Sequence, residues 1–135
     1  YIILNQDNPC AIGKWYQWHI KTPLDIDIMN QCCNKIIGEK DFKSFESTGS
    51  PRSSTVRKVL YSRITRLDKN RLAFKICANG FLKYMVRNLI GTIVLAGSKK
   101  ISLDEFVKII EAKDRSKAGP TAPAHGLFLK RVNYS

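Results

Sequence analysis

The sequence predicts an α+β domain in which helices pack on one face of a mostly antiparallel sheet. Short aromatic and β-branched runs between turn residues indicate strands, and two such runs joined by the turn "DKNR" indicate a β-hairpin. Three other segments carry apolar residues at three- and four-residue spacing, which is typical of amphipathic helices. No internal repeat or linker interrupts the 135 residues, so we expect a single domain over residues 1–135.

The first third of the chain is expected to form two strands and a helix. The opening "YIIL" and the run "WYQWHI" at 15–20 are the strands. A Thr-Pro pair at 22–23 opens the helix, which Gly38 ends. The segment "DFKSF" at 41–45 is expected to be a short irregular turn anchored by its two phenylalanines.

The remaining two thirds are expected to form the hairpin, two helices and a last strand. The hairpin strands cover 59–67 and 72–79, and an apolar helix covers 81–95. The "SLDE" run at 102–105 is a capping box that begins the third helix. The run "LFLKRVNY" at 127–134 completes a ββαββααβ order.

The charge balance favours a polyanionic partner. Lysine and arginine number 23 against 11 aspartates and glutamates, which gives a net charge of +12. The alternative is charge that serves solubility alone. The Ser- and Gly-rich segment 46–58 contains Arg52, Arg57 and Lys58, and it is compatible with either a plain surface loop or one that contacts RNA.

Composition also argues against several other classes of protein. No apolar run reaches the roughly 18–20 residues of a membrane span, so no membrane association is expected. Cys10, Cys32, Cys33 and Cys77 lack C-x-x-C spacing, and we expect no metal site. Cys32, Cys33 and Cys77 fall in predicted regular elements, so we expect buried, reduced thiols of a cytosolic protein.

The apolar helix "GFLKYMVRNLIG" carries a narrow polar stripe. Its two rows are Lys83, Arg87 and Gly91 in one, and Tyr84, Asn88 and Thr92 in the other. One interpretation is the solvent face of an amphipathic helix. The other is a site for a carboxylate or phosphate, because like charges four residues apart repel and a mid-helix glycine costs about 1 kcal/mol. An arginine suits that role because its fork binds such groups bidentately.

The loop "GPTAPAHG" at 119–126 is short of side chains and rich in proline. Such a loop could press its backbone against a ligand and hold Leu127 at a fixed place. A plain connecting loop is the alternative.

Several blocks together resemble one enzyme family. The blocks are "GFLKYMVRNLIGTI", "KDRSKAGPTAPAHGLFLKRVNY", "GEKDFKSF" and the opening "YIIL". In this order they resemble the C-terminal half of the bacterial tRNA pseudouridine synthase A family, and the resemblance runs from Tyr1 to Ser135.

The resemblance implies a function. The family converts uridines of the tRNA anticodon stem-loop to pseudouridine without a cofactor, as cytoplasmic homodimers with a basic cleft for tRNA. An aspartate is the nucleophile, an arginine pairs with it and a leucine packs beside the flipped base. By motif, the arginine corresponds to Arg87 and the leucine to Leu127. Lys83, with Arg52, Arg57 and Lys58, is expected on the RNA-binding surface.

The chain departs from the family pattern in one decisive respect. The family's nucleophile lies in a "GRTDAGVH"-like motif, and nothing like it occurs here. Tyr1 matches the second, structural tyrosine of a Y-x-Y pair whose first member stacks on the base. We therefore expect that the N-terminal half of the catalytic region lies outside this chain and that the chain alone is inactive. The alternative is a non-catalytic RNA-binding or dimerisation module with the same fold.

Overall fold

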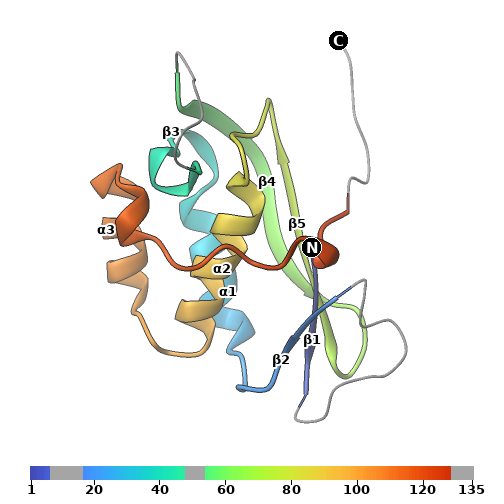
Figure 1. Ribbon diagram of the computed structural model, residues 1–135. Coiled ribbons are helices and arrows are strands. Elements are labelled where there is room, and N and C mark those ends of the chain that lie inside the picture. Colours follow the sequence, from blue (N-terminus) through green and yellow to red (C-terminus); the bar gives the residue numbers. More distant parts are fainter. Residues whose placement is uncertain (7–16, 48–53, 129–135) are drawn as a thin grey trace.

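The computed structural model describes residues 1–6, 17–47 and 54–128, which form a sheet with helices on one face (Figure 1). The strands are β1 (Ile2–Asn5), β2 (Trp18–Ile20), β3 (Gly38–Asp41), β4 (Val56–Arg66) and β5 (Arg71–Ala78), and the helices are α1 (Ile26–Lys35), α2 (Met85–Gly97) and α3 (Leu103–Ala112). The five strands described lie in the order β2-β1-β5-β4-β3. Only the β1–β2 pairing in this sheet is parallel, so the α+β prediction is confirmed.

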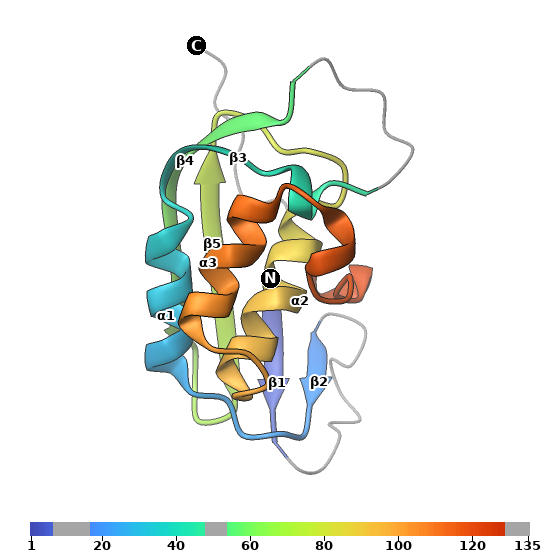
Figure 2. The same cartoon turned by 90° about the vertical axis from the view of Figure 1, so that its left-hand side faces the viewer.

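The helices form two layers on the same side of the sheet. Helices α1 and α2 lie against the sheet, and α3 packs outside them (Figures 1 and 2). The largest fully buried side chains include Phe42, Phe45, Phe74 and Phe106, which come from all parts of the chain. The two phenylalanines of "DFKSF" are thus anchors of the core, as predicted, around a 3₁₀ turn at Lys43–Phe45.

The predicted hairpin is confirmed, with β4 starting three residues before the predicted strand. Its register pairs Ser62 with Ile76 and Ile64 with Phe74, all on the side facing the helices. The turn is closed by Asp68, whose carboxylate accepts hydrogen bonds from the backbone N–H groups of Asn70 and Arg71. A short polar side chain that binds the following backbone is the usual chemistry of such a turn.

Capping side chains and backbone conformation determine where the helices begin. Asp25, rather than the Thr-Pro pair, caps α1, because its carboxylate accepts from the Ile28 N–H at 3.2 Å. The predicted capping box of α3 is confirmed, with Ser102 and Glu105 bonding each other's backbone. Helix α2 begins at Met85 and not at residue 81, because Tyr84 has a left-handed backbone with φ of 60°.

The structure differs from the sequence prediction at two strands. Strand β3 was not predicted, because "GEKD" has no apolar alternation; as an edge strand it pairs only with β4 and takes polar residues. The predicted strand at 127–134 lies outside the described residues from 129 onward, and residues 127–128 are not in a strand.

The thiols only partly match the prediction. Cys32 and Cys33 are fully buried, and burial raises the pKa of the Cys32 thiol to about 12 and that of Cys33 to about 11. Cys77, in contrast, is exposed, so its predicted burial is wrong. It pairs with Tyr61 on the face of the sheet away from the helices.

The described residues contain no helix that is long and apolar enough to cross a bilayer. Within the same residues, no group of three or more His, Cys, Asp or Glu side chains is arranged to hold a metal ion.

Candidate active site

The loop that follows α3 packs along the polar residues Asn88 and Thr92 of α2. We refer to these residues and their contacts with the loop as the docking track. Asn88 and Thr92 are both fully buried, so the solvent-face interpretation is wrong for these two residues, whereas Tyr84 of the same row is exposed. Thr92 Oγ1 donates to the carbonyl of Asn88 within the helix and accepts from the backbone N–H of Gly119 in the loop at 2.9 Å. The polar row therefore exists to satisfy the backbone of the loop.

Asn88 is the centre of this contact. Its amide Nδ2 donates to the Phe45 carbonyl at 2.7 Å, and its Oδ1 accepts from Thr121 Oγ1 at 2.6 Å and from Arg115 Nη2 at 3.2 Å. Arg115 Nη1 also donates to the Gly119 carbonyl at 2.9 Å. One buried amide thus ties together α2, the "DFKSF" turn and the loop.

Gly91 brings the loop onto the helix backbone. A β-carbon at this position would lie 1.8 Å from the Pro120 carbonyl oxygen, which is impossible without a backbone shift. One interpretation of the sequence attributes this glycine to a nearby anion; in the structure the group that comes close is the peptide backbone of the proline-rich loop.

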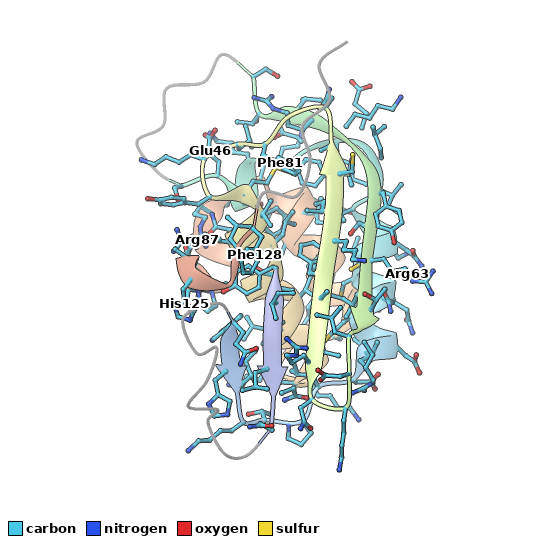
Figure 3. The ribbon with its side chains drawn as sticks, turned by 90° about the vertical axis from the view of Figure 1, so that its right-hand side faces the viewer. Glu46, Arg63, Phe81, Arg87, His125 and Phe128 are labelled. Atoms are coloured by element: carbon cyan, nitrogen blue, oxygen red, sulfur yellow. The ribbon has the colours of Figure 1, made fainter. Side chains whose placement is uncertain are left out.

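Arg87 is held on the same loop. Its Nε donates to the Ala122 carbonyl at 2.8 Å, while the Ala122 N–H donates to the Arg87 carbonyl at 3.1 Å. Its guanidinium carbon also lies 4.7 Å from the centre of the Tyr84 ring, within range of a cation–π contact. Arg87 is partly buried, and Figure 3 shows it on the side of the molecule that also carries Phe128 and His125.

Arg87 makes no ion pair within the part of the chain that the structure describes. The ion pair found there joins Arg71 to Asp68 in the hairpin turn. The guanidinium is therefore fixed through Nε, while its positive charge is not neutralised by any carboxylate of the described residues.

Lys83 lies before the helix and not within it. Tyr84 precedes the first residue of α2, so helical spacing does not relate Lys83 to Arg87, and the repulsion argument based on it was wrong. Both cations instead lie near the exposed Tyr84 ring, with Lys83 Nζ 5.4 Å from its centre.

Tyr1 fixes the far end of the loop. Its hydroxyl donates to the Pro123 carbonyl, and its ring leaves no room for a side chain at residue 126, where a β-carbon would come within 2.6 Å. Burial raises the pKa of this hydroxyl, an effect that the nearby Arg87 charge partly offsets, so it stays protonated as a donor.

Leu127 is presented at the surface by this loop. It follows the 3₁₀ turn Ala124–Gly126, donates its N–H to the Ala124 carbonyl at 3.0 Å and is 41% exposed. Ala122, which binds Arg87, is five residues earlier on the same tethered segment. The structure thus places the two predicted site residues on one rigid unit.

The other three residues predicted to bind RNA differ in their contacts and exposure, and one of them is not described. Arg57 is partly committed to its own strand, because its Nη1 donates to the carbonyls of Ser54 and Val56. Lys58 is exposed and lies opposite Glu39 of β3. Arg52 lies outside the described residues.

Sequence reasoning missed the structural role of Asn88, Thr92 and Arg115. The polar row on an otherwise apolar helix indicates that polar partners cover it, but it does not reveal whether water or a buried loop supplies them. Nothing in the sequence indicated which partners those would be.

Comparison with known proteins places the chain in one family. A profile of the family described as tRNA pseudouridine synthase matches residues 32–135. The tRNA pseudouridine synthase A of Thermoanaerobacter sp. strain X514 is 41% identical over 134 residues, and that of Clostridium acetobutylicum is 40% identical over 134 residues. Each alignment covers 99% of this chain and 54% of the relative.

A third relative extends the comparison to another lineage. The enzyme of the same name from Bdellovibrio bacteriovorus is 38% identical over 135 residues, which is 99% of this chain and 51% of the relative. The chain therefore spans about half the length of the curated relatives it matches. The family profile includes Arg87, Leu127 and the whole docking track between them, and the chain belongs to the tRNA pseudouridine synthase family.

Proposed function

We propose that this chain is the C-terminal half of the catalytic region of an enzyme that converts uridines of the tRNA anticodon stem-loop to pseudouridine. Two facts support the proposal: the chain belongs to the family, and it spans about half the length of its relatives. The observation that carries it is Arg87, anchored through Nε on the loop and without a carboxylate partner among the described residues.

In this proposal the missing partner is a nucleophilic aspartate from the other half of the enzyme. The reaction breaks the bond between the ribose C1′ and uracil N1 and forms one from C1′ to C5. C5 loses its proton and N1 gains one, so the net change is an isomerisation that requires no cofactor. Arg87 would hold the aspartate ionised, because an opposite charge nearby lowers the pKa of a carboxyl group. Nε is already committed to Ala122, which leaves the terminal nitrogens of the fork for that carboxylate.

Leu127 would form an apolar wall for the flipped uracil. It is exposed, yet its position is fixed by the loop's bonds to α2 and to Tyr1. A base taken out of its stack needs contacts of this kind to replace stacking. Lys83, Arg57, Lys58 and Arg52 would contribute to a basic surface for the tRNA, in a cytoplasmic homodimer.

Substitution of the two site residues tests these roles. In the full-length enzyme, Arg87→Ala should abolish tritium release from tRNA labelled at uracil C5, while tRNA affinity stays within about three-fold, because phosphate contacts elsewhere supply most of the binding. Leu127→Ala should lower turnover less, since only packing is lost. Full activity of Arg87→Ala would refute the role of the arginine.

The isolated 135-residue chain provides a second test. It should bind tRNA weakly, with an affinity that falls steeply as salt is raised, and should form no pseudouridine. Filter binding over a salt series and tritium release measure the two properties on the same sample. Turnover by the isolated chain would mean that the nucleophile lies within it. An inactive full-length protein would favour a non-catalytic RNA-binding module instead.

A further inference from the structure

Two cations face each other on the side of the sheet that none of the described helices covers. Arg63 of β4 and Lys75 of β5 are direct partners in the antiparallel register, and both are exposed. The residues on either side of Arg63, Ser62 and Ile64, are buried and face the helices. Figure 3 looks onto this uncovered face, with Arg63 labelled on β4.

This arrangement opposes the stability of the hairpin. Like charges directly opposite each other in an antiparallel pair repel, whereas opposite charges attract. Elsewhere in the sheet, Glu39 lies opposite Lys58, and Asp68 forms an ion pair with Arg71 in the hairpin turn. Lys40 and Arg57 form a second pair of opposed cations, but there the Arg57 guanidinium is bound to the carbonyls of Ser54 and Val56. Within the part of the chain that the structure describes, neither Arg63 nor Lys75 forms an ion pair.

An exposed aromatic side chain lies one pair further along the same face. Tyr61 is 45% exposed and is the register partner of Cys77, also exposed. An irregularity in the register between Val59 and Tyr61 precedes it, and bulges of this kind redirect side chains at functional surfaces. We refer to Tyr61, Arg63 and Lys75 as the cationic strip.

We propose that the cationic strip binds the sugar–phosphate backbone of the RNA substrate, away from the nucleotide that reacts. Phosphates between Arg63 and Lys75 would turn a repulsive pair into a favourable one, and Tyr61 offers a ring to a sugar or an unpaired base. A second copy of this chain is a poor occupant, because a two-fold contact would bring four cations together. The inference rests on the proposed function, because it takes RNA as the substrate.

The test uses Lys75→Glu in the full-length enzyme, because stability and binding should change in opposite directions. The new carboxylate would pair with Arg63, so the midpoint of thermal unfolding should rise. The affinity for tRNA should fall about ten-fold near 0.1 M salt, and the slope of log K against log salt should become smaller by about one. Arg63→Glu is the reciprocal variant and should behave alike.

The matched control is Lys108→Glu. Lys108 is an exposed lysine of α3, in the outer helical layer on the other side of the sheet, and it undergoes the same change of charge. Its effect on tRNA affinity should stay within about two-fold, because a charge more than a Debye length from the RNA is largely screened. A loss equal to that of Lys75→Glu would indicate a net-charge effect and overturn the proposal.

Two other outcomes would also overturn it. Unchanged affinity and salt slope in Lys75→Glu would leave the strip as solvated surface. A change of sedimentation coefficient without a change in RNA affinity would assign the face to self-association. The wild-type enzyme separates the two proposals: if tRNA binding depends on Lys75 as predicted but the wild-type enzyme forms no pseudouridine, the proposed function alone is refuted.

Discussion

At the scale of single residues, Gly91 shows how a position that weakens a helix can stabilise the fold. The Pro120 carbonyl occupies the place where a β-carbon would be, at 1.8 Å from its ideal position. Helix propensity alone predicts that alanine would stabilise α2 by about 1 kcal/mol. The contact predicts the opposite sign, since an overpacked site costs about 1–3 kcal/mol and here the obstacle is backbone.

We therefore expect Gly91→Ala to lower the free energy of unfolding in urea denaturation and to reduce activity. The control is Gly97→Ala in the same helix, where a β-carbon would meet the Met29 side chain at 2.7 Å; a side chain can change rotamer more readily than a backbone carbonyl can move, so the loss should be smaller. A Gly91→Ala protein at least as stable as the wild type would show that the loop does not lie against the helix.

Residue roles were only partly predictable from sequence. Arg87 and Leu127 stand in motifs, and their chemistry suggests a counter-charge and an apolar wall. The burial of Asn88 and Thr92 was not predictable, because a polar row on an apolar helix has the same pattern whether water or a polar loop covers it. Cys77 was misjudged because alternation in a strand does not reveal which of its two faces the helices cover.

At the scale of elements, the loop 119–126 behaves as part of α2. It is held along the helix by hydrogen bonds that Thr92 and Asn88 accept and one that Arg87 donates, and Tyr1 holds its end. The sequence suggests that this loop faces a ligand. In the structure it is hydrogen-bonded to α2, and its last residues reach the surface.

Removal of the central amide should release this loop. Asn88→Ala leaves the Phe45 carbonyl without its side-chain donor and removes one acceptor from Arg115 and from Thr121, and we expect a loss of about 1–3 kcal/mol of unfolding free energy. Hydrogen exchange should show faster exchange at the Gly119 and Ala122 amides than in the wild type. Unchanged exchange at both amides would indicate that the loop is held without Asn88.

Element positions were predicted well where local chemistry decides them. The capping box of α3 and the Asp68 turn were visible in the sequence because each contact lies within four residues. Strand β3 was not, because a four-residue polar edge strand is stabilised by its pairing with β4, which lies at least fifteen residues further on. Likewise, the start of α2 depends on the left-handed backbone of Tyr84, which no sequence pattern signals.

At the scale of the whole molecule, the proposed function makes this chain one half of an active site. It supplies a fixed cation, an apolar residue on the same loop and a net charge of +12, which suits a polyanionic substrate. Under the proposed function, the carboxylate that completes the site comes from the other half of the enzyme. The arginine and the carboxylate would then balance each other's charge only after the two halves associate, and neither half alone would need to contain the complete site.

The pH dependence of kcat/KM for pseudouridine formation tests this pairing most directly. Removal of the Arg87 charge should raise the pKa of the catalytic carboxyl group, so in Arg87→Gln the loss of activity at low pH should move to higher pH by about 1–3 units. Arg87→Lys retains a cation, and its acid limb should stay close to that of the wild type. If residual Arg87→Gln activity followed the wild-type pH profile, no carboxylate would depend on Arg87, and the central claim would be contradicted.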